Sequence, residues 1–306
     1  MSEGGETVDR GFGLVGAGIM GKGLARNLLA GGFELSVFDI DPAAVERAVG
    51  MGAKPANGLA GLCAAAATIG TCLQSIDAIR AVYLGPDGLI ANAREGSVLV
   101  DFSTGDPAVT RELAEQGAAR SVHVIDAPML RMEQHAWEGT IVLLVGGPVE
   151  IVERCRSAFE AVSERFVHCG PVGSGHIFKL LNNVNGLCMH AMYAETFALA
   201  AKLGADLDLL LEVLSSGMSN STILGALSKR ILTAEDGPVF ATEVALKDVS
   251  LFARLAADTG SPSLLASATR EIYQLAALMG YGDKDVVSVG AALREISLGQ
   301  RAGGAG

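Results

Sequence analysis

The sequence predicts an α/β protein in which a doubly wound parallel sheet is followed by an all-helical C-terminal domain. Up to about residue 170, short apolar runs alternate with helical segments, the pattern of a parallel sheet covered on both faces. Beyond that point the strand signals fade and only helical segments follow. The glycine cluster Gly16–Gly21 also lies between the first apolar run and the first helix, where a phosphate-binding turn belongs.

The elements of the first domain follow from local signals. An apolar run over residues 12–15 ends in glycine, and the helix after it ends at Gly31-Gly32. Asp39 closes the second strand, and a proline in the first turn begins the next helix after Asp41. The expected strands are Phe12–Val15, Leu35–Phe38, Thr68–Leu73, Ser97–Asp101, Val122–Asp126 and Ile141–Val145, and the expected helices are Met20–Ala30, Pro42–Val49, Ser75–Leu84, Pro107–Gln116 and Val149–Val162.

The second domain is expected to begin after Pro171, which gives domains 1–171 and 172–306. Its first helix, Ile177–Leu203, is apolar nearly all round, so we expect a long helix that joins the domains and is buried between domains or subunits. The glycine-rich tail, Gly303–Gly306, is expected to be disordered. The remaining helices are expected at Asp208–Ser215, Ser221–Leu232, Thr242–Asp258, Ser263–Met279 and Asp285–Ser297.

Composition limits the classes of partner. The chain has 306 residues and a formal net charge of −11, which argues against a nucleic-acid partner because phosphate backbones require a basic surface. No apolar run is long enough to span a bilayer, and the polar segment Met1–Arg10 does not resemble a secretory signal. We therefore expect a cytoplasmic protein without membrane contact. The five cysteines lack the spacing of a zinc knuckle or a redox pair, so we expect free thiols and no metal.

The cluster Gly16–Gly21 matches the pattern G-x-G-x-x-G of dinucleotide-binding proteins, with Ile19 and Met20 between its last two glycines. Gly16 permits a tight turn, and Gly18 lets the backbone approach a pyrophosphate. Gly21 lets the helix pack closely on the strand, so that its N-terminal amides meet the negative charge. We expect these residues to bind the cofactor.

Asp39 lies about twenty residues further on, where a carboxylate accepts hydrogen bonds from the adenosine ribose. A carboxylate repels a 2′-phosphate, and neither Ile40 nor Asp41 could bind that phosphate as an arginine would. This favours NAD over NADP. The alternative is that Asp39 only caps the next turn.

The second half of the site is predicted on the long helix. Lys179, Asn182, Asn183 and Gly186 fall near one helix face. The helix dipole and the apolar neighbours both disfavour the charged form of this lysine, as suits a group that carries a proton. Two amides can orient the ammonium and a substrate hydroxyl, and Gly186 leaves room for the substrate. The alternative is a solvated surface lysine.

These motifs together resemble the β-hydroxyacid dehydrogenase family over nearly the whole chain. The resemblance implies a Rossmann-like NAD-binding domain, a helical second domain, an active site in the cleft and a homodimer or homotetramer built through the helical domain. The motifs are Gly16–Gly21, Asp126-Ala127-Pro128, Gly139-Thr140, Gly146-Gly147, Gly173–Asn183 and Lys247-Asp248.

The resemblance also implies residue roles. Lys179 matches the catalytic lysine of the family, and Asn183 matches its neighbouring asparagine. Lys247 matches the lysine on the nicotinamide side, while Leu73 and Thr104 match cofactor-contacting positions. Ser103 is expected beside the substrate; the alternative for Ser103 and Thr104 is a capping turn ahead of the Pro107 helix, and the two roles are compatible.

The chain departs from the family pattern at Met129-Leu130-Arg131, where many relatives have small residues that hold a substrate carboxylate. Arg131 stands in the anion position, as in a family member that binds a sulfonate, and a guanidinium offers a planar fork to either anion. We therefore expect a small anionic substrate. The alternative is a surface ion pair between Arg131 and Glu133. His135 and Trp137 are expected either to shape the pocket mouth or to cover the sheet edge.

The sequence thus predicts an NAD-dependent oxidoreductase that interconverts a small anionic 3-hydroxy acid and its aldehyde or ketone, with Lys179 as the acid/base. An imine reductase and a non-catalytic dinucleotide-binding module are the alternatives of another class, and the retained lysine argues against both. The pattern from Gly173 to Lys179 also resembles 6-phosphogluconate dehydrogenase, but that enzyme is much longer. We expect His176 to position the start of the helix instead.

Overall fold

The computed structural model describes residues 10–225, 230 and 240–299. The chain divides into two compact units, Met1–Lys179 and Leu180–Gly306, and helix α10 (Ser174–Lys202) begins in the first and continues into the second. The division falls a few residues beyond the expected boundary at residue 171, because the first turn of α10 is hydrogen-bonded to the sheet unit.

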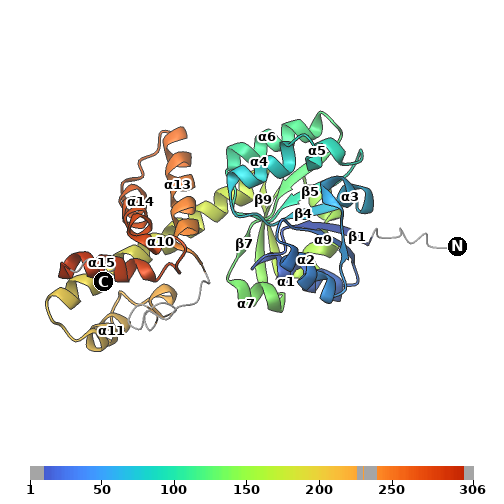
Figure 1. Cartoon of the computed structure of the whole chain (residues 1–306). Helices are drawn as coiled ribbons and strands as arrows, with labels where there is room; N and C mark the ends of the chain where they lie inside the picture. The colour runs from blue at the N-terminus through green and yellow to red at the C-terminus, as the bar shows by residue number, and fades with distance from the viewer. Residues whose placement is uncertain (1–9, 226–229, 231–239, 300–306) are drawn as a thin grey trace. The chain divides into compact units, whose positions relative to one another are not determined.

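The first unit is built on a sheet whose strand order is β3-β2-β1-β4-β5-β6-β8-β7, with β9 paired to β8 (Figure 1). The pairs are parallel except β6–β8 and β7–β8, which are antiparallel. The order reverses between β1 and β4, which is where ligands bind in doubly wound sheets. The strands are β1 (Gly11–Val15), β2 (Glu34–Phe38), β3 (Lys54–Pro55), β4 (Thr68–Thr71), β5 (Val98–Asp101), β6 (His123–Asp126), β7 (Met129–Leu130), β8 (Ile141–Gly146) and β9 (Ser163–Gly170).

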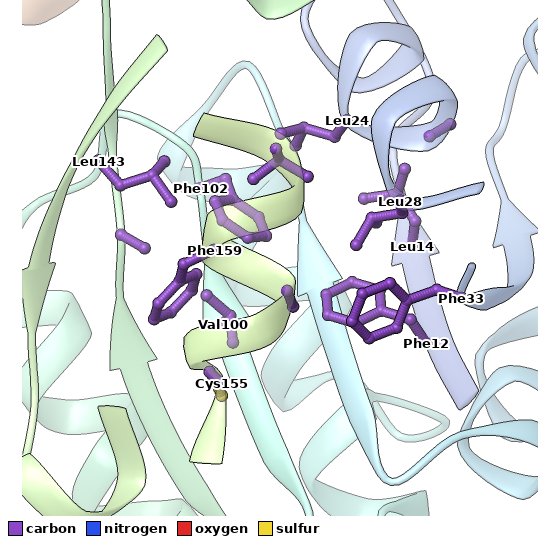
Figure 2. Close-up of a cluster of buried hydrophobic side chains, with 14 of the residues drawn as sticks. Phe12, Leu14, Leu24, Leu28, Phe33, Val100, Phe102, Leu143, Cys155 and Phe159 are labelled. Carbon is purple, nitrogen blue, oxygen red and sulfur yellow. The ribbon is translucent and has the colours of Figure 1, made fainter. Parts of the chain in front are cut away.

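Helices cover both faces of this sheet, so the expected Rossmann-like architecture is confirmed (Figure 1). On one face, Leu24 and Leu28 of α1 and Phe159 of α9 pack on the strands (Figure 2). On the other face, α3 to α6 enclose Tyr83 and Leu113. The helices are α1 (Gly21–Ala30), α2 (Pro42–Gly50), α3 (Gly58–Ala65), α4 (Ile76–Leu84), α5 (Leu89–Asn92), α6 (Pro107–Ala118), α7 (Glu133–Glu138), α8 (Val149–Arg154) and α9 (Arg156–Val162).

Side-chain caps explain where several helices start. The carboxylate of Asp41 accepts a hydrogen bond from Ala43 N at 3.0 Å ahead of α2. Asp106 accepts one from Ala108 N at 2.8 Å ahead of α6. In both helices a proline follows the cap, where its missing N–H costs no hydrogen bond.

Two sequence expectations for this unit are wrong. The segment expected as one helix over 149–162 forms two helices that are interrupted at Cys155, where φ is −92° and ψ is −2°. The strand at 141–146 runs antiparallel to β6 rather than parallel. The elements α3, α5, α7, β3, β7 and β9 were not predicted.

The second unit is helical in its described part, as expected. Tyr273 and Val249 are fully buried at its centre with Ala245. The expected helix over 221–232 lies partly outside the described residues, and the tail 303–306 lies wholly outside them. The elements are the remainder of α10, α11 (Leu207–Ser216), α13 (Thr242–Asp258), α14 (Leu264–Ala276), the π-helical turn η1 (Ala277–Tyr281) and α15 (Ser288–Leu298).

Within the described residues, no helix combines the length and apolar character needed to cross a membrane. The five cysteines, all of which are described, are free; Cys63 and Cys155 are buried and the other three are half-buried.

Candidate active site

The glycine turn follows β1 at the point where the strand order reverses. Gly16 has φ +90°, and an added Cβ there would lie 2.3 Å from Cys72 O after β4. A Cβ on Gly21 would lie 1.9 Å from Gly16 O, so no side chain fits at either place. An added Cβ on Gly18 would meet nothing within 4 Å. The turn is therefore closed toward the protein and open on the side where Gly18 lies.

The start of α1 fits a dinucleotide. No side chain caps its first turn, which leaves the start of the helix open to a phosphate group. Ile19 is 43% exposed beside this opening, whereas Met20 packs against the core. Burial raises the pKa of the nearby Cys72 thiol to about 12, with Asp101 and Asp39 adding to the effect. The thiol thus stays protonated at neutral pH.

Asp39 is fixed beside the glycine turn by two backbone amides. Its Oδ2 accepts a hydrogen bond from Ala17 N at 2.7 Å, and its Oδ1 accepts one from Asp41 N at 2.9 Å. Each carboxylate oxygen has a second lone pair, so both can still accept a ribose hydroxyl. Asp39 therefore caps the local turn, as the alternative reading expected, and its position also suits the cofactor role.

The loops after β4 and β5 are joined through Ser103. Its hydroxyl accepts a hydrogen bond from Leu73 N at 2.9 Å, and its side chain is buried. Its own N–H donates to Asp101 Oδ1 at 3.0 Å. Ser103 thus holds Leu73 and the adjacent Thr104 at the carboxyl edge of the sheet. The glycine turn lies at the same edge, after the neighbouring strand β1.

Asp126, at the end of β6, caps helix α10. Its Oδ1 accepts from Gly173 N at 2.6 Å and its Oδ2 from His176 N at 2.8 Å. Burial raises the pKa of Asp126, while His176 and these two amides act in the opposite direction. The sequence analysis assigns this aspartate no role. Its distance of nearly fifty positions from the helix that it caps explains why.

Lys179 and Asn183 lie one turn apart on α10. In the second unit, Asn183 Nδ2 donates to Asp248 Oδ2 at 2.7 Å. Lys247 pairs with the other oxygen of this buried carboxylate at 2.9 Å. Because the amide nitrogen of Asn183 faces Asp248, its Oδ1 faces away from that carboxylate and can accept a hydrogen bond from a hydroxyl group. Asp248 thus contacts two of the predicted site residues, and the sequence analysis assigns it no role although it adjoins Lys247.

The other two predicted positions on α10 have ordinary surroundings. Asn182 is exposed, and its Nδ2 donates to Asn183 Oδ1 at 3.4 Å. An added Cβ on Gly186 would lie 3.5 Å from Ile223 Cδ1, which is normal van der Waals contact. The substrate roles of Asn182 and Gly186 therefore stay predictions.

Arg131 has φ +77°, a left-handed conformation that is uncommon for a residue with a side chain. Its guanidinium contacts Thr140 O and pairs with Glu164 Oε2 of β9 at 2.5 Å. The alternative partner, Glu133, instead pairs with Lys22 at 2.5 Å, so that part of the expectation is wrong. The ion pair is half-exposed, which leaves Arg131 accessible to an anion.

Helix α7 packs mainly on α1 and also contacts strand β8. Arg26 lies over the Trp137 ring, 4.7 Å from its centroid, and contacts Trp137 O. Asn27 Nδ2 donates to Ala136 O at 2.8 Å. His135 Nδ1 accepts from Met132 N at 3.4 Å at the start of the helix. Trp137, the only tryptophan in the chain, thus lies against Arg26 of helix α1, which follows the glycine turn.

Two family descriptions match the chain in succession. The NAD-binding domain of 6-phosphogluconate dehydrogenase matches residues 11–170. The domain described as NAD-binding of NADP-dependent 3-hydroxyisobutyrate dehydrogenase matches residues 173–293.

Relatives support the same assignment. The chain is 31% identical to 3-sulfolactaldehyde reductase of Escherichia coli over 89% of its length and 91% of that protein. It is 32% identical to mitochondrial 3-hydroxyisobutyrate dehydrogenase of Bos taurus over 92% of its length and 86% of that protein. A solved structure of Mycobacterium tuberculosis 3-hydroxyisobutyrate dehydrogenase with L-serine has a TM-score of 0.82 at 26% identity, covering 92% of this chain and 98% of that one.

The residues around the glycine turn fit a dinucleotide, and the resemblance expected from the sequence motifs is confirmed. The chain belongs to the β-hydroxyacid dehydrogenase family of nicotinamide-dependent oxidoreductases.

Proposed function

We propose that this enzyme uses NAD to interconvert a small anionic 3-hydroxy acid and its aldehyde or ketone, with Lys179 as the general acid/base. Family membership supports the general activity, which is that of a nicotinamide-dependent hydroxyacid dehydrogenase acting on small acids. The contact between Asn183 and Asp248 supports the more specific mechanism, because it engages the amide nitrogen and leaves Asn183 Oδ1 able to accept a hydrogen bond from a substrate hydroxyl.

The bound nicotinamide supplies a hydride acceptor for the carbinol carbon. Lys179 accepts the hydroxyl proton in the oxidative direction and returns it in the reductive one. Asn183 Oδ1 accepts a hydrogen bond from the hydroxyl and so orients the oxygen toward the lysine. Asp248 holds Asn183 and Lys247 in fixed orientations, which limits the loss of side-chain entropy when the substrate binds.

Asp39 supports the preference for NAD. Its carboxylate is held by Ala17 N and Asp41 N, so it cannot turn away from a 2′-phosphate without losing two hydrogen bonds. Ile40, the next residue, offers no positive charge.

Arg131 is the proposed anion-binding residue. A left-handed backbone costs a non-glycine residue about 1–3 kcal/mol, and such residues cluster at active sites and ligand clamps. Its contact with Glu164 demonstrates that the guanidinium can reach a carboxylate from this backbone position. The alternative is a purely structural ion pair. A relative named 3-sulfolactaldehyde reductase makes a sulfonate substrate the specific alternative to a carboxylate.

The test is formation of NADH across matched carboxylate, sulfonate and neutral 3-hydroxy compounds. We expect turnover of the anions and a KM for the neutral alcohols at least 10-fold higher. Arg131→Gln should raise the KM of the anions by roughly 10-fold to 100-fold, because a charge-assisted hydrogen-bonded pair contributes about 1.5–3 kcal/mol, and should not affect the neutral compounds. Equal turnover of all three classes by the unmodified enzyme would refute anion selection.

We also propose a homodimer or homotetramer assembled through the second unit. An apolar groove lies between α10 and α14, and Leu264 and Leu265 beside it are 86% and 70% exposed. Patches of this kind mark association sites. Light scattering during gel filtration tests the proposal, and a monomeric mass at micromolar concentration would contradict it.

A further inference from the structure

His176 is a fully buried side chain whose two ring nitrogens both have partners. Its Nε2 lies 3.1 Å from Ser103 O, on the loop after β5. Its Nδ1 lies 2.8 Å from the Thr110 hydroxyl on α6. Its backbone N–H donates to Asp126 at the end of β6. One residue in the first turn of α10 is therefore tied to three different elements of the sheet unit.

The direction of the first bond follows from chemistry. Ser103 O is a carbonyl oxygen and can only accept, so Nε2 carries a hydrogen and donates it. The Thr110 hydroxyl has one hydrogen, with Asp106 O at 3.0 Å and His176 Nδ1 at 2.8 Å as its possible acceptors. In either arrangement the bond to Ser103 persists, so the ring links α10 to that loop.

The surroundings leave the ring little freedom. An added Cβ on Gly105 would lie 2.6 Å from His176 Cε1, so the loop backbone packs directly against the ring. Asp101 Oδ2 lies 3.9 Å from Nε2, and Asp101 is itself held by Thr71 Oγ1 at 3.0 Å. Asp101 and Asp126 are both buried, and they face each other at the ends of the paired strands β5 and β6.

We propose that His176 is a positioning residue that fixes the first turn of α10 to the Ser103 loop and so sets the location of the Lys179 ammonium. Lys179 follows three residues later, on the same side of the helix. Thr104 follows Ser103 directly. The contact thus joins the predicted proton carrier to the loop that carries a predicted cofactor contact, entirely within the first unit. The inference rests on the proposed function of Lys179.

Loss of the His176 contacts should affect the rate of catalysis more than the stability of the fold. A displacement of about 1 Å at a reacting group can lower a rate by about 100-fold. Cofactor affinity should persist, because His176 bonds to Ser103, Thr110 and Asp126, whereas Asp39 is held by the backbone of the glycine turn. We expect kcat to fall while the affinity for NADH does not change.

The test uses three variants of the full-length enzyme. His176→Leu removes both ring contacts and should lower kcat by about 100-fold. His176→Gln keeps a neutral donor that can reach Ser103 O and should recover a large part of that loss. Gly105→Ala keeps every hydrogen-bonding group but displaces the ring and should also lower kcat. Dissociation constants for NADH come from energy transfer between Trp137 and the bound nicotinamide.

His190→Leu is the matched control, because it removes another buried histidine of α10 that lies in the second unit and bonds to Tyr273. We expect it to reduce stability and to leave kcat within about twofold. If His176→Leu and Gly105→Ala keep the kcat of the unmodified enzyme, or if Gln rescues no better than Leu, the inference is wrong. If Lys179→Met keeps full turnover, the proposed function itself fails. Should His176→Leu not fold, the Gln and Gly105→Ala variants decide the question.

Discussion

Cofactor choice is the feature of this enzyme that a single charge should control. Asp39→Asn removes that charge but keeps an oxygen that can accept from Ala17 N, now 2.7 Å from the carboxylate. Adding Ile40→Arg supplies a cation at a side chain that is 94% exposed, so no packing is lost. The quantity to measure is the ratio of the NADPH and NADH dissociation constants.

The magnitude follows from the fixed position of the carboxylate. Two like charges about 4 Å apart repel by about 1 kcal/mol in water and about 4 kcal/mol near a protein surface. Removing the charge of Asp39 should therefore lower the dissociation constant for NADPH relative to that for NADH by roughly 5-fold to 1000-fold. The double variant should shift it further, because a guanidinium binds phosphate directly. Loop damage affects both cofactors equally and cancels in the ratio.

Energy transfer from Trp137 to the reduced nicotinamide reports both dissociation constants in one assay. Asp41→Asn is the control, because its carboxylate instead caps α2 through Ala43 N at 3.0 Å and lies 3.5 Å from Arg47. This variant loses the same charge close by and should leave the ratio within about twofold. An unchanged ratio in Asp39→Asn would refute the assignment of selectivity to Asp39.

Two further predictions concern buried titratable groups. Burial lowers the pKa of His190 to about 4. Below about pH 6.5 the unfolded chain takes up a proton at this histidine, whereas the folded chain does not. The free energy of unfolding should therefore fall as the pH drops, by about 2 kcal/mol near pH 5. Urea unfolding at several pH values checks this, and a His190→Gln variant with the same pH slope would contradict it. Because the pKa of the Cys72 thiol is raised to about 12, it should resist alkylation at pH 8 in the folded enzyme and react after unfolding. Rapid labelling of Cys72 in the folded state, read by peptide mass spectrometry, would contradict this.

Sequence alone anticipated the elements that are buried on both faces. Strands such as Val98–Asp101 are continuous apolar runs because helices cover them from both sides. β9, Ser163–Gly170, was missed because its exposed, charged residues alternate with few apolar ones. α3, Gly58–Ala65, lacks a side-chain cap and consists mostly of small residues. An apolar run does not indicate whether its strand is parallel or antiparallel to its neighbours, so the antiparallel pairing of β8 with β6 was not predictable.

The candidate site also combines features that the sequence predicts with contacts that it does not. Gly16 and Asp39 were predictable, because the turn and the carboxylate follow strands at a characteristic spacing. The partners of Arg131 and Asn183 were not, since Glu164 and Asp248 lie 33 and 65 positions away. Such contacts depend on how strands and helices pack, which sequence periodicity does not encode.

The central claim is that the Lys179 amine moves the substrate proton. The most direct measurement is the single-turnover rate of hydride transfer in Lys179→Ala, with and without small primary amines in solution. We expect the rate to fall by about 100-fold to 10,000-fold, the affinity for NADH to stay unchanged, and added amines to restore part of the rate. A variant that transfers hydride at the rate of the unmodified enzyme would contradict the claim.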